Sequence, residues 1–458
     1  MGNKFLNWLF MREPRLFDKK KVYGLMLDMF KKLDVSNDNK ISRTEFSNNM
    51  PVFESFDKDK NGYIDREELY GEDRKKICVT LLNRSNYGRL KPVMQKLNEH
   101  EEIELQVICG GSMLLDKYGT PINQVKQDKF IINEEIAIEL EGSTLETMAK
   151  STGLTIIDLA SAYNRLKPDF ALLIGDRYET LGAAIASSYQ NICTIHLQGG
   201  EVTGSIDESI RHAITKLSHY HFPATKKAAE NIIAMGENPN TVFHCGCPSA
   251  DVILELEDRL ISENIYSQGV GWPFDLSKPY FLVIFHPTTT EFQDLARQTE
   301  QILLSLSGFW GSECSQTLIF WPNIDAGADR IAEQIRIWRE MDYLPHPHVF
   351  KNLDLEDFIP LLKKATVAIG NSSSLIRDAS FLGTPVVLVG TRQDGREHTN
   401  AVLKVKAEHN EIREAVKKQM KHGRYERSEL YGTFGASQRI VDKILELKPY
   451  SQKRLYYE

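Results

Sequence analysis

From residue 77 onward the chain repeats one pattern, in which a short apolar run ends in Gly, Asn or Asp and a helical stretch follows. Within each run the apolar residues are consecutive, as in parallel strands that are buried on both faces. Helices that alternate with such strands form βαβ units, so the pattern predicts a doubly wound α/β architecture. The predicted strands span residues 77–82, 105–109, 170–174, 193–197, 281–285, 318–321, 367–369 and 386–389.

Length and composition limit what the chain can be. Its 458 residues are too many for one ordinary domain, and 41% hydrophobic with 26% charged residues is typical of a globular protein. A net charge of -7 argues against a nucleic-acid partner, and no apolar run approaches the roughly 20 residues of a membrane span. The six cysteines are too scattered for a disulfide framework, so we expect reduced thiols in a cytoplasmic protein.

The changes in composition and pattern along the sequence predict three parts. Residues 1–74 are polar and rich in lysine, and the α/β pattern then fills residues 75–250 and 251–458. A stretch with Gly, Pro and Trp at residues 269–278 interrupts this pattern and indicates a hinge just before it. We therefore expect a small α-helical module followed by two α/β domains.

Residues 57–68, with the sequence DKDKNGYIDREE, fit a calcium-binding loop at every demanding position. Gly62 permits the sharp turn, and Ile64 is expected to pair with a second loop in a short β-bridge. A solvated acidic turn would not require this full pattern, so we predict an EF-hand loop that binds Ca²⁺. Its ligands are Asp57, Asp59, Asn61, the carbonyl of Tyr63, Asp65 and the bidentate Glu68.

Residues 34–45 form a second loop of the same kind. Asn39 replaces the turn glycine, which is tolerable because Asn enters the left-handed backbone region more readily than most residues. With fewer carboxylates this loop should bind Ca²⁺ more weakly, and its close spacing to the first loop predicts a compact EF-hand pair. Its ligands are Asp34, Ser36, Asp38, the carbonyl of Lys40, Ser42 and Glu45.

Polar clusters follow four of the predicted strands, at the sheet edge where open α/β sheets bind ligands. Asp176 and Arg177 suit acid/base chemistry beside a charge-stabilising cation, although a structural ion pair would explain them equally well. Three serines open a helix at residues 372–374, where hydroxyls and free amides favour a diphosphate. The clusters span residues 83–90, 175–179, 196–212 and 370–374, and residues 390–396 add further cations.

From residue 77 nearly to the C-terminus the chain resembles the hydrolysing UDP-N-acetylglucosamine 2-epimerases, which make N-acetylmannosamine for sialic acid. The resemblance implies a GT-B fold, with two Rossmann-like domains, a cleft between them and a final helix that crosses back. It does not cover the calcium-binding loops. The matching stretches are residues 84–90, 175–177, 199–201, 205–216 (SIDESIRHAITK), 286–287, 322–327 (PNIDAG), 370–373 and 383–395.

The resemblance also implies roles for individual residues. Asp378 stands where the family has a ribose-binding carboxylate, usually Glu, and Gln198 stands where the animal enzyme has a catalytic Glu. Because Gln cannot exchange protons, Asp176 and Asp207 are the expected acid/base residues. UDP is expected to contact Arg84, His286, Asn323, Ser372, Ser373 and Arg392, with Arg177 also facing the nucleotide sugar.

The reaction expected from the resemblance is elimination followed by hydration. When the bond to UDP breaks first, the developing oxocarbenium acidifies C2–H, a carboxylate removes that proton, and a glycal results. Arg177, His286 and the serines at 372 and 373 would stabilise the leaving group. Water then adds with the opposite configuration at C2, and no metal is required for this chemistry.

Three other readings remain open from the sequence. The same reaction could act on UDP-2,4-diacetamido-trideoxyglucose, on the way to legionaminic acid. A GT-B glycosyltransferase is a second possibility, against which the stretch SIDESIRHAITK argues. A calcium-responsive protein that binds a sugar nucleotide without turnover is the third. For the epimerase we expect a UDP-sugar as the partner and a homo-oligomer, either a dimer or a tetramer.

Overall fold

The computed structural model describes residues 41–42, 60, 62–64, 74–314, 316–341 and 343–456. Near the N-terminus two short strands, β1 (Ile41–Ser42) and β2 (Tyr63–Ile64), pair antiparallel with Ile41 opposite Ile64. Both isoleucines are fully buried. The predicted pairing of Ile64 with the second loop in a short β-bridge is therefore confirmed.

The first large sheet has six strands in the order β5-β4-β3-β6-β7-β8, and all neighbours are parallel. In β3 the side chains of Ile77 and Val79 face one hydrophobic core and Cys78 faces another, as in a strand that is buried on both faces. The strands are β3 (Lys75–Leu81), β4 (Ile103–Gly110), β5 (Glu134–Ile136), β6 (Phe170–Ile174), β7 (Cys193–Leu197) and β8 (Tyr220–Phe222).

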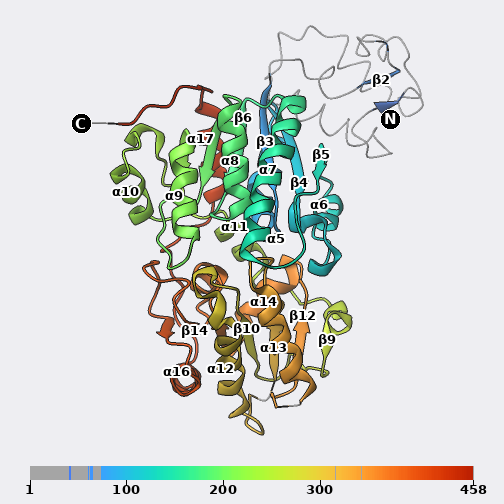
Figure 1. The fold of residues 1–458 in the computed structure, drawn as a ribbon, viewed down its shortest axis with the longest axis vertical. Helices are drawn as coiled ribbons and strands as arrows, with labels where there is room; N and C mark the ends of the chain where they lie inside the picture. Colours follow the sequence, from blue (N-terminus) through green and yellow to red (C-terminus); the bar gives the residue numbers. More distant parts are fainter. Residues whose placement is uncertain are drawn as a thin grey trace, which may run out of the picture.

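The helices of this half lie on both faces of the sheet (Figure 1). Residues of α5 and α17 share the core of one face, and residues of α7, α8 and α9 share the core of the other. The helices are α5 (Arg84–Glu99), α6 (Ile122–Gln127), α7 (Leu145–Leu166), α8 (Tyr178–Tyr189), α9 (Asp207–Leu217), α10 (Lys226–Ala234) and α17 (Ala436–Glu446).

The second large sheet has seven strands in the order β15-β14-β13-β10-β11-β12-β9. Every pair is parallel except that of β9 with β12. The strands are β9 (Val270–Gly271), β10 (Phe281–Ile284), β11 (Thr317–Phe320), β12 (Pro347–Phe350), β13 (Val367–Gly370), β14 (Val386–Val389) and β15 (Val402–Val405). The helices of this half are α11 (Ser249–Leu256), α12 (Leu295–Ser307), α13 (Ala328–Glu340), α14 (Leu355–Lys364), α15 (Arg377–Leu382) and α16 (His409–His422).

All eight predicted strands form, and the doubly wound α/β architecture is confirmed. The strands that the apolar pattern did not predict are those nearer the sheet edges and the short ones, β5, β8, β9, β12 and β15. Residues 269–278 do not simply link two domains, because Val270 and Gly271 form the edge strand β9. The predicted domain boundary after residue 250 falls inside α11, whose apolar residues join the core of the second sheet.

The C-terminal segment connects the two halves. Helix α17 follows the second half in the chain but packs on α5, and its Ile440, Val441 and Ile444 join the core of the first sheet. Figure 1 shows this red helix among the elements of the first half. All six cysteines are free thiols, as the sequence predicts. Within the described residues, no helix combines the length and apolar character needed to cross a membrane.

Candidate active site between the two sheets

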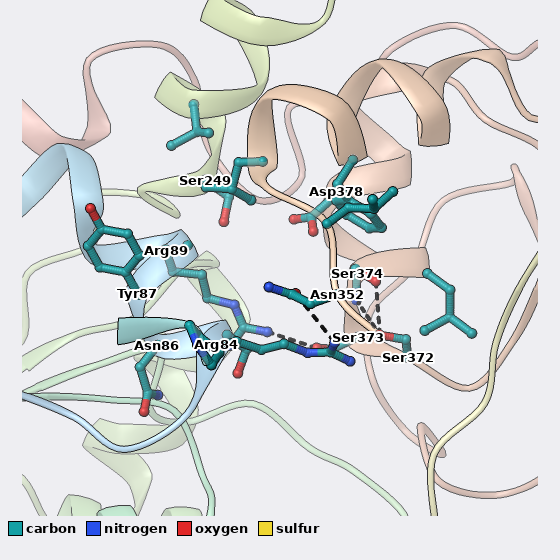
Figure 2. A pocket seen from close by; sticks show the side chains of 18 of the residues that line it. Arg84, Asn86, Tyr87, Arg89, Ser249, Asn352, Ser372, Ser373, Ser374 and Asp378 are labelled. Carbon is teal, nitrogen blue, oxygen red and sulfur yellow. Dashed lines mark hydrogen bonds between the residues drawn. The ribbon is translucent and has the colours of Figure 1, made fainter. Parts of the chain in front are cut away.

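A cleft lies between the two halves, where the polar turns after β3 and β6 face those after β10 and β13. Asp207 and Gln198 do not line this cleft, but each contacts an arginine that does. Figure 2 shows the side chains that converge there. Nine of the eleven site residues predicted outside residues 34–45 and 57–68 line the cleft: Arg84, Asp176, Arg177, His286, Asn323, Ser372, Ser373, Asp378 and Arg392.

The serine turn follows β13 in the second half. Gly370 has a φ of 138°, and a Cβ there would lie 2.0 Å from the carbonyl oxygen of Ile284, so the close approach of the two strands requires glycine. Beyond it Ser372 caps a short helical turn, accepting from the Ser374 N–H at 3.4 Å. The hydroxyls of Ser372 and Ser373 therefore face the cleft on a fixed backbone.

His286 is held as a neutral hydrogen-bond donor. Its backbone N–H donates to Asn371 Oδ1 at 2.7 Å, and its Nδ1 accepts from the Asn323 N–H at 3.3 Å. Because Nδ1 is an acceptor, the ring proton of the neutral imidazole is on Nε2. Burial lowers the pKa of His286 well below its usual range, and the arginines at 392, 84 and 177 lower it further. The side chain can donate one hydrogen bond to an anion without carrying charge.

Arg84 joins the two halves at the first turn of α5. Its Nη1 donates to the carbonyl of Lys351 at 2.7 Å, and its Nη2 donates to Asn323 Oδ1 at 3.2 Å. Burial lowers its pKa to about 10, so the guanidinium remains charged at neutral pH. The side chain is oriented by oxygens and keeps its positive charge facing the cleft.

Arg177, at the N-terminal end of α8, is held by two buried carboxylates. Its Nε donates to Glu179 at 2.7 Å, and its Nη1 donates to both oxygens of Asp325 at 2.8 and 2.9 Å. Its Nη2 is buried and has no hydrogen-bond partner among the described residues. The Nε–Nη1 edge of this guanidinium is thus fixed by the two carboxylates, while Nη2 can donate to a ligand.

Asp176 is held as a permanent anion. Arg211 donates to its Oδ2 through both Nε and Nη2, the former at 3.1 Å, and Arg396 Nη2 lies 3.6 Å from the same oxygen. Burial alone would raise the pKa of Asp176, but these two guanidinium groups outweigh burial and lower it. The carboxylate therefore stays ionised throughout the usual pH range and is poorly suited to carry protons.

Asp207 has the opposite properties. It is the first residue of α9, and its nearest cation is Arg392, whose Nη2 lies 3.4 Å from Oδ2. Burial raises the pKa of Asp207 to about 6, with Arg392 opposing the shift and the charge of Asp176 adding to it. A carboxyl group that titrates close to neutral pH is suited to general acid/base work.

Gln198 occupies a special backbone position directly after β7. Its φ of 63° is uncommon for a residue other than glycine, and its N–H donates to the Phe222 carbonyl at 2.9 Å. Its side chain accepts from Arg89 at 3.1 Å and donates to Cys247 Sγ at 3.1 Å. Sequence reasoning identified Gln198 but did not identify its partner Arg89.

Other residues that the sequence did not single out complete the charge network. Glu201 binds Arg377 at 2.6 Å and lies 3.0 Å from Arg396, so it ties the first half to the second. With Arg211 and Asp325, these residues fall inside or beside the stretches that carry the family resemblance. The available signal was the excess of charged residues in strand-end turns, but the pairing between distant turns required the fold.

The structure describes only part of the two predicted EF-hand loops. Gly62 has a φ of 88°, as the sharp turn at that loop position requires, and Ser42 and Tyr63 lie opposite each other in β1 and β2. These features fit a pair of EF-hand loops. The other predicted ligands lie outside the described residues: Asp34, Ser36, Asp38, Lys40, Glu45, Asp57, Asp59, Asn61, Asp65 and Glu68. Within the part of the chain that the structure describes, no three His, Cys, Asp or Glu side chains group as a metal site.

Comparison with known proteins places this site in a family. A UDP-N,N'-diacetylbacillosamine 2-epimerase (hydrolyzing) of Legionella pneumophila is 33% identical over 380 residues, which cover 82% of this chain and 97% of the relative. A UDP-N-acetylglucosamine 2-epimerase of Neisseria meningitidis serogroup B is 29% identical over 357 residues, which cover 78% of this chain and 90% of the relative.

The fold agrees with a solved structure. The crystal structure of Methanocaldococcus jannaschii UDP-GlcNAc 2-epimerase in complex with UDP-GlcNAc and UDP superposes with a TM-score of 0.67 at 17% identity, covering 81% of this chain and 100% of that chain. The predicted GT-B fold is thereby confirmed. The sequence model of the UDP-N-acetylglucosamine 2-epimerase family matches residues 95–445, and an EF-hand model matches residues 27–51 and 50–70. The chain therefore belongs to the UDP-N-acetylglucosamine 2-epimerase family, as a UDP-sugar 2-epimerase preceded by EF-hand motifs.

Proposed function

We propose that this protein is a hydrolysing UDP-sugar 2-epimerase, which converts a UDP-linked 2-acetamido sugar and water into UDP and the free 2-epimer. The observation that carries the proposal is Asp207, a half-buried carboxyl whose pKa is raised to about 6 and which contacts Arg392, a cation that lines the cleft. A proton carrier and an anion-binding cation are thus adjacent at the meeting point of the two halves.

Leaving-group stabilisation falls mainly to the second half. Nε2–H of His286, the hydroxyls of Ser372 and Ser373 and the guanidinium of Arg392 offer donors to a diphosphate. From the first half, the unpartnered Nη2 of Arg177 can add a further charged donor. These groups stabilise charge that grows on the phosphate oxygen as the C1–O bond breaks, which accelerates that step.

The two aspartates take different parts in the chemistry. As C1–O breaks, the electron-poor C1 acidifies the C2–H bond, and Asp207 in its ionised form accepts that proton. A C1=C2 double bond forms, water then adds its oxygen to C1, and a solvent-derived proton is delivered to the opposite face of C2. Asp176, which Arg211 and Arg396 hold ionised, stabilises positive charge at the sugar without exchanging protons.

Two substrates are candidates for this reaction. UDP-N-acetylglucosamine is the substrate that the sequence resemblance implies, and the Neisseria relative is named for it. The Legionella relative, which has the higher identity and coverage, is named for UDP-N,N'-diacetylbacillosamine, the 2,4-diacetamido-trideoxy sugar. Both carry the 2-acetamido group and the UDP leaving group that the mechanism uses, so they differ only in substituents at C4 and C6.

NMR of the reaction in deuterated water tests the proposal. With each sugar nucleotide in turn, the released 2-epimer should carry deuterium at C2, because the proton that returns comes from solvent. Protium retained at C2 would refute the elimination route. Binding of UDP without release of sugar from either substrate would instead support the non-catalytic alternative, and transfer of sugar only to an added acceptor would indicate a glycosyltransferase.

The EF-hand loops are proposed to bind Ca²⁺ outside the catalytic site. The described residues Ser42 and Tyr63 and the positive φ of Gly62 support this assignment, together with the EF-hand matches. We further propose a cytoplasmic homo-oligomer, a dimer or tetramer, in which residues 1–74 regulate stability or assembly and residues 75–250 and 251–458 form the catalytic domains.

A further inference from the structure

Arg89 is a cation of the cleft that has only neutral partners. It lies on α5 in the first half, and its Nη2 crosses to Ser373 Oγ in the second half at 2.9 Å (Figure 2). Its Nη1 donates to Oε1 of Gln198 at 3.1 Å. Among the described residues, no carboxylate forms an ion pair with this guanidinium. Arg89 therefore differs from Arg177, Arg211 and Arg377, which are each neutralised by a carboxylate.

The position of Arg89 is unfavourable for a charge without an anion. Burial lowers its pKa, and the nearby charge of Arg377 lowers it further, whereas the charges of Asp378 and Asp176 oppose the shift. A cation that is partly withdrawn from water and lies within no ion pair costs free energy, which an anionic ligand can offset. Because the guanidinium lines the cleft and reaches Ser373 of the serine turn, a ligand phosphate bound at that turn would meet it directly.

Gln198 contacts Arg89 without neutralising its positive charge. Its amide is fixed at both ends, with Oε1 on Arg89 and Nε2 on Cys247, and its backbone is held at a φ of 63°. An amide oxygen orients the guanidinium but does not neutralise it. A carboxylate at the same place would form an ion pair with Arg89 and compete with any phosphate for it.

We propose that Arg89 is a diphosphate-binding residue contributed by the first half, and that Gln198 is a positioning residue that orients Arg89 while leaving its charge uncompensated. The inference rests on the proposed function, because the diphosphate belongs to the sugar nucleotide. It assigns residue 198 to binding of the nucleotide rather than to proton transfer. It also means that ligand binding joins the two halves through the α5 arginine.

Calorimetric titration of the full chain with UDP tests this proposal without requiring turnover. Replacing the charge in Arg89→Gln should weaken UDP binding about tenfold or more, and Gln198→Glu should weaken it by a similar factor. In the double variant, Gln198→Glu should have little further effect, because no guanidinium remains for the new carboxylate to neutralise. Arg89→Lys keeps the charge and should lose less affinity than Arg89→Gln.

Two comparisons separate charge compensation from damage to the fold. Uridine, which lacks phosphate, should bind all variants with unchanged affinity. Lys96→Gln removes a positive charge from the same helix, where Lys96 donates to Gln438, and should leave UDP affinity unchanged. Equal loss of uridine and UDP affinity, or unchanged UDP affinity in Gln198→Glu, would overturn the proposal. If UDP does not bind the unmodified protein, the proposed function itself fails, which is a different outcome.

Discussion

Arg177 of the first half donates from a single nitrogen, Nη1, to both carboxylate oxygens of Asp325 in the second half. Each of these side chains is only 9% exposed. The pair joins the two halves beside the predicted nucleotide site, and it orients Arg177, which lines the cleft. A second ion pair across the halves, Lys117 with Asp329, is largely exposed and provides a natural comparison.

The Asp325→Asn variant should therefore lose both activity and stability. Removing one charge of a buried ion pair leaves the other charge uncompensated, which lowers the free energy of unfolding by about 3–5 kcal/mol. We expect the thermal unfolding temperature to fall and kcat/KM to drop about tenfold or more, because Arg177 loses one of its two anchors. Asp329→Asn is the control, and exposed pairs contribute only about 0–1 kcal/mol, so its unfolding temperature should stay close to that of the unmodified protein. Similar behaviour of the two variants would show that the Arg177–Asp325 pair has no special role.

Asp207 should set the acid limb of the pH–rate profile. Its pKa is raised to about 6, and the base must be ionised to accept the C2 proton. As pH falls below about 6, the protonated fraction grows and kcat/KM should fall about tenfold per pH unit. Asp207→Asn should slow turnover by about a hundredfold or more and abolish this limb. A limb that persists unchanged in Asp207→Asn would assign the proton transfer to another group.

Asp176→Asn should behave differently from Asp207→Asn. The charge of Asp176 contributes to the raised pKa of Asp207, so its removal favours the ionised form of Asp207 and lowers that pKa. The acid limb should then move to lower pH, while the maximum rate falls about a hundredfold because an anion near the sugar is lost. A pH–rate series on the two variants distinguishes a fixed charge from a proton carrier. Loss of the limb in Asp176→Asn would contradict this division of roles.

Eight strands of the two large sheets were predictable because consecutive Val, Ile and Leu residues mark parallel strands that are buried on both faces. β12 escaped prediction because it begins with Pro347 and includes His348, and β9 because it is only two residues long. For the site, motifs indicated which turns carry chemistry, and most of the predicted residues line one cleft.

The pairing of charges could not be predicted from the sequence. Arg89 and Ser373 are separated by 284 positions, and Arg177 and Asp325 by 148, so their contact depends on how the two halves meet. The difference between Asp176 and Asp207 also follows from packing, because Arg211 and Arg396 both approach the first, whereas Arg392 is the cation beside the second. Identical side chains therefore acquire different chemistry through neighbours that lie far away in the sequence.

The two EF-hand loops should bind Ca²⁺ cooperatively, because Ile41 and Ile64 pair in β1 and β2 and are both fully buried. Residues 57–68 have more carboxylate ligands and a turn glycine, so this loop should bind more tightly than residues 34–45.

In calcium titrations, Glu68→Gln should remove most of the tighter site and also weaken the other site. The reason is that β1 and β2 form one small sheet, so ordering of one loop helps to order the other. Glu45→Gln should mainly affect the weaker site. Ile64→Ala keeps every ligand but removes buried methyl groups, at a cost of about 2–5 kcal/mol, and should weaken both sites together. Independent loss of each site in the two Glu variants, with no effect of Ile64→Ala, would show that the loops act separately. A chelator that removes Ca²⁺ should leave most of the epimerase activity, since the described residues that line the cleft all belong to the two large halves.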